Sequence, residues 1–107
     1  MRLAAAIAAL TIVTVSPLAG HADEGSPGEG RKIAEAQCAR CHAVGQGEIL
    51  SPNDDAPTFG LIANSEHNAQ SLRVFLRTPH VTMPSIVLSD RDRDDVTAYI
   101  MSLRRNE

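Results

Sequence analysis

The clearest periodic pattern lies near the C-terminal end of the chain. Val96, Tyr99, Ile100 and Leu103 stand at i, i+3, i+4 and i+7, so their side chains share one face of a helix. Ser89, a residue type favoured at the helix N-cap, comes shortly before them. The pattern predicts a helix that begins after Ser89 and packs this apolar face against the core.

Charged residues around this stretch also favour a helix. Acidic side chains in the first turn and basic ones at the end complement the helix dipole, and the chain has Asp90 and Asp92 at the start and Arg104 and Arg105 at the end. The mixed charges over residues 90–95 are expected to form a solvated face, with a docking role as the alternative.

A shorter amphipathic helix is predicted over Ala69–Arg77. Three large hydrophobic residues there fall at i, i+3 and i+4: Leu72, Phe75 and Leu76. Asn68 or Ser65 is placed to cap this helix, and Pro79 is placed to stop it.

Another helix is predicted to begin after Ser26. This residue suits the N-cap, Pro27 suits the first helical position, and Glu29 would complete a capping box. The small residues Gly30 and Ala34 lie on one face and would let another helix approach closely. The helix is expected to reach the two cysteines of the chain.

The N-terminal segment has the pattern of a secretory signal peptide. Arg2 supplies a positive start, an almost unbroken apolar run covers Leu3–Val15, and small residues precede a cleavage site after Ala22. A retained membrane anchor is the alternative, although the run is shorter than the ~20 residues that a spanning helix needs. We expect residues 1–22 to be removed and residues 23–107 to form one domain without a membrane span.

Composition limits what the mature chain can bind. Loss of residues 1–22 shortens 107 residues to 85 and removes one of ten basic residues but none of the thirteen acidic ones, which leaves a formal charge of −4 with neutral histidines. This acidic balance argues against a nucleic-acid partner. With no tryptophan, one tyrosine and two phenylalanines, such a small domain needs a cofactor or metal to complete its core.

The segment Cys38–His42 reads C-x-x-C-H and contains both cysteines of the chain. This motif is typical of covalent haem c attachment. Thiols three residues apart on a helical turn point the same way, so each can add across one vinyl group of the porphyrin. We therefore predict one haem c, held by thioethers to Cys38 and Cys41, with His42 as an axial ligand of the iron.

Three other kinds of site contain a cysteine pair. A thioredoxin-like dithiol accompanies a βαβ pattern, and no convincing strands are found here. A zinc site needs four well-spread ligands. A plain disulfide suits an oxidising compartment. All three stay open as less favoured alternatives.

Four residues are candidates for the second axial position: Met83, Met101, His67 and His80. Met101 follows the apolar-face residue Ile100 on a regular helix, so its side chain should point away from that face. Met83 precedes Pro84, which stiffens the backbone. We predict Met83 as the second ligand, with His80 as the runner-up.

Two segments lack helical periodicity. Turn-forming residues over Gly45–Ala56 predict a surface loop, with Ile49–Leu50 folded back onto the haem edge. Ala56–Ala63 mixes apolar residues with a proline and is expected to run from a loop into one short helical turn.

These features together resemble the bacterial class I cytochromes c, a family of small monohaem proteins. The resemblance covers about residues 30–103 and rests on Gly30, the C-x-x-C-H motif, Pro57, the pair Met83-Pro84 and Tyr99 in the last helix. It implies an all-α fold of about three to five helices around one covalent haem. It also implies that the Pro57 carbonyl accepts a hydrogen bond from His42 and orients it, and that Tyr99 packs across the first helix.

Two departures from the family pattern bear on packing and on the haem carboxylates. Ala34 stands where the family often has an aromatic residue, so the crossing of the first and last helices must be packed differently. Because tryptophan is absent, the usual partner of the haem propionates is missing, and Arg73 or Arg77 is a candidate substitute.

The resemblance implies an electron-transfer protein that is not an enzyme, and the signal peptide predicts that it lies in the periplasm. One six-coordinate haem would cycle between Fe(II) and Fe(III) and exchange electrons with redox protein partners, whose identity the sequence does not specify. The alternatives are an electron-entry subunit of a periplasmic dehydrogenase or oxidase complex, and a haem protein with weak peroxidase or gas-binding activity.

Overall fold

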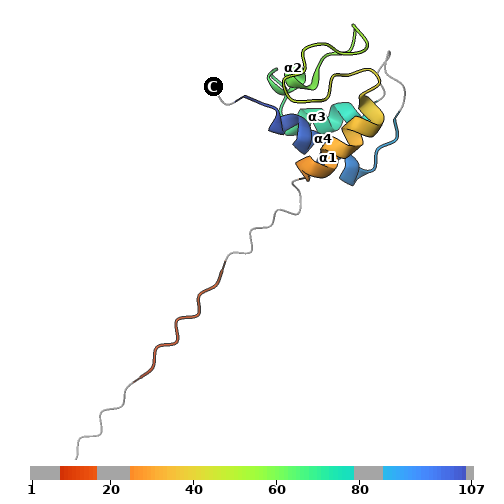
Figure 1. Ribbon diagram of the computed structural model, residues 1–107. Coiled ribbons are helices and arrows are strands. Elements are labelled where there is room, and N and C mark those ends of the chain that lie inside the picture. Colours follow the sequence, from red (N-terminus) through yellow and green to blue (C-terminus); the bar gives the residue numbers. More distant parts are fainter. Residues whose placement is uncertain (1–7, 17–24, 79–85, 106–107) are drawn as a thin grey trace, which may run out of the picture.

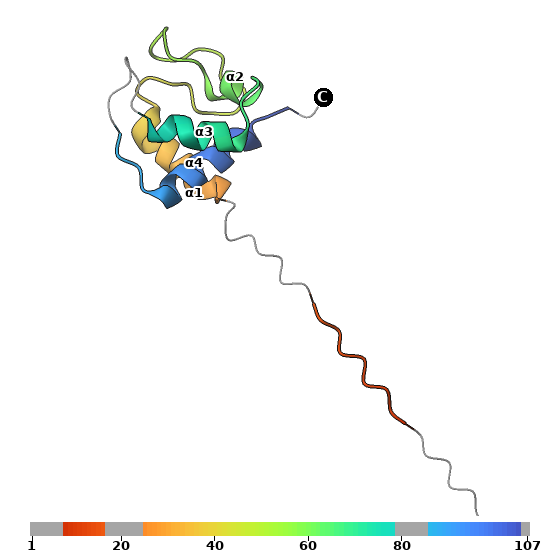
Figure 2. The same ribbon diagram turned by 180° about the vertical axis from the view of Figure 1, so that it is seen from behind.

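The computed structural model describes residues 8–16, 25–78 and 86–105. Its elements are, in order, α1 (Pro27–Ile33), the π-helical turn η1 (Ala34–Cys38), α2 (Phe59–Ala63), α3 (Ala69–Arg77) and α4 (Asp90–Ser102). No strand occurs in the described ranges. Helix α4 lies between α1 and α3 (Figures 1 and 2). The predicted all-α fold is confirmed, and four α-helices fall within the expected number.

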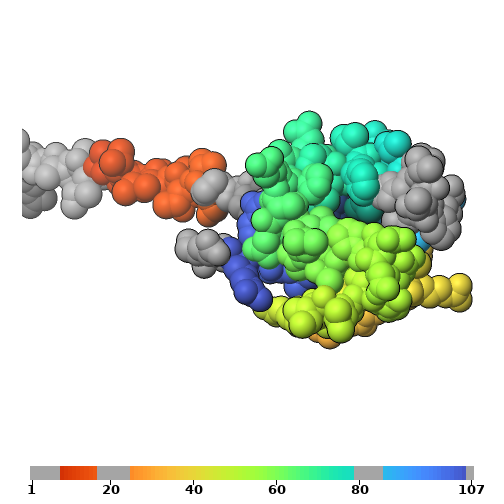
Figure 3. Space-filling view, turned by 90° about the horizontal axis from the view of Figure 1, so that it is seen from above, coloured from red at the N-terminus to blue at the C-terminus, as the bar shows by residue number. Residues whose placement is uncertain are grey.

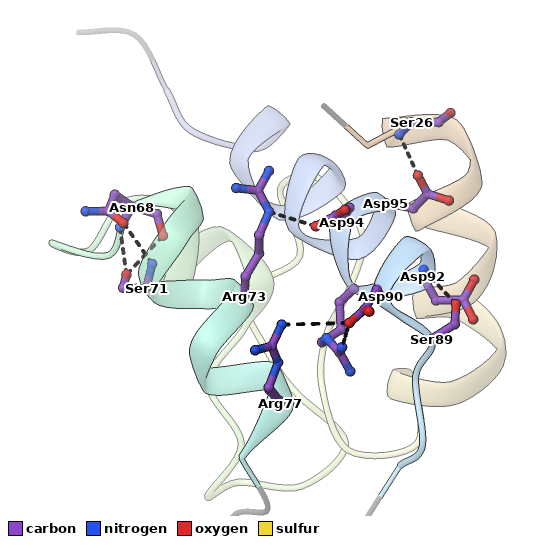
Figure 4. A network of polar contacts seen from close by, with 11 residues as sticks. Ser26, Asn68, Ser71, Arg73, Arg77, Ser89, Asp90, Asp92, Asp94 and Asp95 are labelled. Atoms are coloured by element: carbon purple, nitrogen blue, oxygen red, sulfur yellow. Dashed lines mark hydrogen bonds and ion pairs between the residues drawn. The ribbon is translucent and has the colours of Figure 1, made fainter. Parts of the chain in front are cut away.

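Helix α1 begins at the predicted residue, but its cap is built differently. The Ser26 hydroxyl accepts the Glu29 N–H at 3.4 Å, as expected. The Glu29 carboxylate, however, binds Lys32 at 2.8 Å, and the Ser26 N–H donates to Asp95 Oδ1 of α4 at 2.7 Å (Figure 4). The predicted capping box is therefore wrong, because α4 supplies the acceptor for the Ser26 N–H.

This contact also corrects the expectation for the charged face of α4. Asp95 is 6 % exposed, so it is not part of a solvated surface. A carboxylate that accepts a backbone N–H at the start of a helix is favoured by the helix dipole. Asp95 therefore joins the start of α1 to the middle of α4.

The crossing of α1 and α4 depends on two small residues. A Cβ atom added at Gly30 would lie 1.9 Å from the Asp95 carbonyl oxygen and 2.8 Å from Tyr99 Cβ. Ala34, one turn later, is completely buried. The close helix approach predicted from Gly30 and Ala34 is confirmed, and so is the packing of Tyr99 across α1.

Helix α3 has the bounds that its sequence pattern predicts. Asn68 is its N-cap and forms a capping box with Ser71, with hydrogen bonds of 2.8 and 3.0 Å. Leu72 is buried, whereas Phe75 is half exposed. Local signals are sufficient here because both halves of the cap lie within four residues of chain.

Ion pairs connect α3 to α4. Arg73 Nε lies 2.8 Å from Asp94 Oδ1, and Arg77 Nη2 lies 3.7 Å from Asp90 Oδ1 (Figure 4). Both arginines therefore extend toward α4.

Helix α4 presents the predicted apolar face to the core. The Ser89 hydroxyl accepts the Asp92 N–H at 3.0 Å and caps the helix as expected. The apolar-face residues of α4 are buried in one cluster with residues of η1, α2 and α3 and of the segment after η1, and Ile33 of α1 packs against this cluster. The members of this cluster are Ala34, Val44, Phe59, Ala63, Leu72, Val96, Tyr99, Ile100 and Leu103.

The connection between η1 and α2 is a surface loop, as predicted, but its apolar pair is not folded inward. Ile49 and Leu50 are each 82 % exposed. The base of the loop is fastened by the hydrogen bonds Asn53 N–H to Cys41 O at 3.1 Å and Ala43 N–H to Ser51 Oγ at 3.0 Å. These bonds leave residues 49 and 50 outside the packed body, so the expectation that they cover the haem edge is wrong.

Residues 8–16 form an extended, exposed segment away from the helices (Figure 1). Within the described ranges no helix has the length and apolarity needed to cross a bilayer. Cleavage after Ala22 falls outside the described residues and stays a prediction.

Candidate haem-attachment site

An apolar cavity of about 490 Å³ opens beside the C-x-x-C-H segment. Its wall includes Phe59 and Ile62 of α2, Leu72 and Leu76 of α3, and Ile100 of α4. A cavity of this size and apolar character is typical of small-molecule and cofactor sites. Helices α2, α3 and α4 thus line one cavity together with residues 36–38 of η1.

Both cysteines line this cavity. Cys38 ends η1, where the bond from the Ala39 N–H to the Ala34 carbonyl, 3.0 Å long, widens the last turn. Cys41 and His42 follow in a tight turn whose N–H groups both donate to Cys38 O, at 3.2 and 3.0 Å. No disulfide joins the thiols. Burial raises the pKa of the Cys38 thiol, so it stays protonated at neutral pH.

The His42 imidazole lies on the same cavity wall, and its orientation is defined. Its Nδ1 is 2.6 Å from the carbonyl oxygen of Pro57, which is the contact that the family resemblance predicts. A backbone carbonyl can only accept, so Nδ1 is the donor and Nε2 is left as the ring's lone-pair nitrogen.

Phe59 is a site residue that the sequence did not single out. Its ring centroid is 5.5 Å from that of His42 and 6.4 Å from that of Tyr99. Its N–H donates to the Ala43 carbonyl at 2.9 Å, which ties the start of α2 to the attachment segment. Thr58, whose hydroxyl caps α2, is the sequence signal that marks where this aromatic residue enters a helix.

Tyr99 holds the other side of the attachment segment. Its hydroxyl donates to the Val44 carbonyl, two residues after His42. The ring is buried, and this burial raises the pKa of the phenol. Tyr99 therefore contacts both α1 and the chain that follows the motif.

The candidates for the second iron ligand are placed unequally. Met83 and His80 lie outside the described residues. Met101 packs partly buried against the core cluster and does not line the cavity. His67 does line the cavity, with its ring stacked on Phe75 at a centroid distance of 6.5 Å.

The two arginines considered as haem carboxylate partners do not line the cavity. Arg73 and Arg77 form the ion pairs with α4 described above. Among the described residues, no group of three or more His, Cys, Asp and Glu side chains is arranged to hold a metal ion.

Comparison with known proteins agrees with this geometry. The family model described as "Cytochrome C oxidase, cbb3-type, subunit III" matches residues 25–100. Cytochrome c-552 of Bradyrhizobium diazoefficiens is 34 % identical over 94 residues, which cover 87 % of this chain and 89 % of that relative. Cytochrome c6 of Cyanidium caldarium is 34 % identical over 74 residues, 68 % of this chain and 67 % of that protein. Cytochrome c6 of Cyanidioschyzon merolae is 31 % identical over 74 residues, 68 % of this chain and 70 % of that protein.

No solved structure matches the chain. The residues present nevertheless fit haem c, because two free thiols and an oriented imidazole lie together on the wall of one apolar cavity. With the family match and these relatives, the chain belongs to the class I monohaem c-type cytochromes, whose cofactor is a covalently bound haem c and whose role is electron transfer.

Proposed function

We propose that this protein is a periplasmic electron carrier whose haem iron has His42 and Met83 as axial ligands. The observation that carries the proposal is the His42 imidazole, held by Pro57 O at 2.6 Å on the cavity wall that both cysteines also line. Bound haem c supplies the one-electron chemistry between Fe(II) and Fe(III).

The cysteines attach the cofactor. Each thiol adds its S–H across one vinyl C=C bond, so that one C–S bond forms and the hydrogen goes to the neighbouring vinyl carbon. This addition needs no oxidant or reductant. Cys38 and Cys41 then hold the cofactor against the apolar wall from one side.

The chain's other site residues orient the proposed iron ligand and set the surroundings of the haem. Pro57 keeps Nδ1 of His42 protonated and leaves Nε2 free to coordinate, as second-shell acceptors do at other metal sites. Apolar walls such as Phe59 and Leu72 exclude water. A thioether opposite an imidazole raises the reduction potential, so we expect the protein to work as an acceptor and donor at relatively high potential.

Export follows from the N-terminal segment. Residues 1–22 act as a cleaved signal peptide and bring the cysteines to the periplasm. There the protein has no substrate of its own and exchanges electrons with redox proteins in brief encounters over a small interface.

Replacement of Met83 tests the ligand assignment. The ferric holoprotein is expected to show a sulfur-to-iron charge-transfer band, and Met83→Ala should abolish it because the thioether is the only sulfur proposed to coordinate. His80→Ala is the matched control and should leave the band intact. Survival of the band in Met83→Ala would show that the assignment is wrong.

A second function is favoured by the description of the matching family, which names a subunit of an oxidase. In that case the chain would pass electrons into a larger complex instead of diffusing freely. Co-purification with a membrane oxidase or a periplasmic dehydrogenase from native cells would support this role. Turnover of the isolated protein as a freely diffusing donor would support the soluble carrier.

A further inference from the structure

The polar residues on the cavity wall divide into two groups. Those of the segment 36–42 lie at or between the attachment points: Gln37, Cys38, Arg40, Cys41 and His42. Within the described part of the chain, only one other residue with a polar side chain lines the cavity, namely His67, from the connection between α2 and α3. His67 thus faces the cavity from a different part of the chain.

The two edges of haem c need different partners on the cavity wall. The two carboxylates of the macrocycle are on the edge opposite the vinyl groups that form the thioethers. A buried carboxylate is costly unless a donor or positive charge meets it. Arg40 stands between the two cysteines and belongs to the thioether edge, whereas His67 enters the cavity independently of the motif.

The backbone that carries His67 is firmly held from α4. The Arg104 guanidinium, just beyond the helix, donates to the carbonyl oxygens of Ala63 at 2.8 Å, Ser65 at 3.3 Å and His67 at 2.8 Å. The Arg105 N–H adds a bond to Asn64 Oδ1 at 3.0 Å. In Figure 3 the end of the chain after α4, in blue, lies beside the green connection that it binds.

The His67 ring is also constrained. It stacks on Phe75 of α3, with an interplanar angle of 29°. Ring stacking on one side and three carbonyl contacts on the backbone fix both the ring and its peptide. A donor that is held in place in this way loses little conformational entropy when it binds a ligand.

We propose that His67 is the hydrogen-bond partner of a haem carboxylate and that Arg104 is the positioning residue that holds it there. This inference rests on the proposed function and extends it, since it assigns the carboxylate contact for which the sequence suggested Arg73 or Arg77. Those two side chains are directed toward Asp94 and Asp90 instead.

A histidine beside a haem carboxylate should make the reduction potential of the haem depend on pH. Imidazole side chains change charge between about pH 5 and pH 8. A positive charge beside the haem favours the ferrous state, which carries one positive charge less than the ferric state. The reduction potential should therefore fall as the pH rises through this range. The other charged groups on the elements around His67 are Glu66 on its own connection, Arg73 and Arg77 on α3, Arg104 and Arg105 after α4, and Arg40 on the cavity wall.

The test is the reduction potential of the holoprotein as a function of pH. Wild type should show the fall between about pH 5 and pH 8, and His67→Asn and His67→Leu should lose it. Glu66→Gln, which changes the neighbouring charge outside the cavity, should keep it. Arg104→Ala should reduce the fall, and Arg104→Lys should restore part of it.

A second measurement uses wild type alone and stays decisive if the variants do not fold. Nuclear Overhauser contacts in the ferrous holoprotein should place the His67 ring beside a haem carboxylate side chain. Contacts of the ring with another part of the haem, or a pH-dependent potential that survives in both His67 variants, would overturn the proposal. Loss of the low-spin spectrum in these variants would also overturn it, because His67 would then ligate the iron. Failure of the proposed function would look different, since wild type would carry no covalent haem.

Discussion

The position of the His42 ring is set by residues far from it in sequence. Pro57 accepts its Nδ1–H, Phe59 packs against its ring, and Tyr99 holds the backbone two residues later. The first of these contacts joins residues 15 positions apart and the last joins residues 55 positions apart. These three contacts orient the His42 ring, which is the usual task of second-shell groups at metal sites.

Tyr99 leads to a prediction about alkaline pH. It is the single tyrosine of the chain, and burial raises the pKa of its phenol. The folded protein therefore keeps this proton to higher pH than the unfolded chain does, so the stabilisation present below about pH 10 is lost as the pH rises through the folded-state value. The melting temperature of the holoprotein should fall in this range, and Tyr99→Phe should flatten the fall.

Lys32 provides the control for this experiment. Hydrogen bonding to Glu29 raises the pKa of its ammonium group, so it titrates in the same direction. The side chain is exposed, and exposed ion pairs contribute little to stability. Lys32→Gln should keep the alkaline fall of wild type; an unchanged fall in Tyr99→Phe would contradict the role given to Tyr99.

At the scale of elements, the crossing of α1 and α4 leaves the least room for larger side chains. Gly30 lies against the Asp95 carbonyl, and the Asp95 side chain accepts a hydrogen bond from the N–H of Ser26, the N-cap of α1. The same residue of α4 thus limits the size of one position in α1 and completes the cap of that helix. Substitutions here should move whole helices.

Gly30→Ala tests this crossing. The added methyl group would lie 1.9 Å from a backbone oxygen, so the helices must separate, and overpacking of this kind costs about 1–3 kcal/mol. Gly28→Ala is the matched control, because a Cβ there meets only Ser26 Oγ at 3.9 Å. Denaturant unfolding of both holoproteins should show a loss for Gly30→Ala alone. Equal stability of the two variants would contradict the packing described.

The elements show what a sequence can predict here. Helix α3 was predicted to the residue because its cap at Asn68 and its apolar spacing are local. The cap of α1 was wrong in one half because its acceptor, Asp95, is 69 positions away. Asp95 stands four residues before Tyr99, so the sequence indicates that it lies on the buried face of α4. The sequence does not indicate that it accepts the Ser26 N–H. The Arg104 contacts had no sequence signal, and an exposed Ile49–Leu50 is unexpected for apolar residues.

At the scale of the whole molecule, we expect the cofactor to complete the core. The cavity of about 490 Å³ has an apolar wall, and several of its side chains also belong to the core cluster, among them Phe59, Leu72 and Ile100. The family and the attachment residues were predictable because they depend on a short contiguous motif, whereas the described residues that line the cavity come from stretches spread between residues 36 and 100.

Because the core is expected to depend on the bound haem, the protein without haem should be largely unfolded. The double variant Cys38→Ala, Cys41→Ala, produced without haem, should give a far-ultraviolet circular dichroism signal with little helix and no cooperative melt. Wild-type holoprotein under the same conditions is the control. A cooperative melt of the variant would show that the protein core suffices without its cofactor.

We expect the chain to hold one covalent, six-coordinate haem c that serves electron transfer. The absorption spectrum of the secreted holoprotein, ferric and ferrous, with and without carbon monoxide, tests it most directly. We predict low-spin spectra in both oxidation states, haem that stays with the protein on denaturation, and a ferrous spectrum that carbon monoxide does not rapidly change. Haem that is released on denaturation, or rapid carbon monoxide binding by the native ferrous protein, would contradict it.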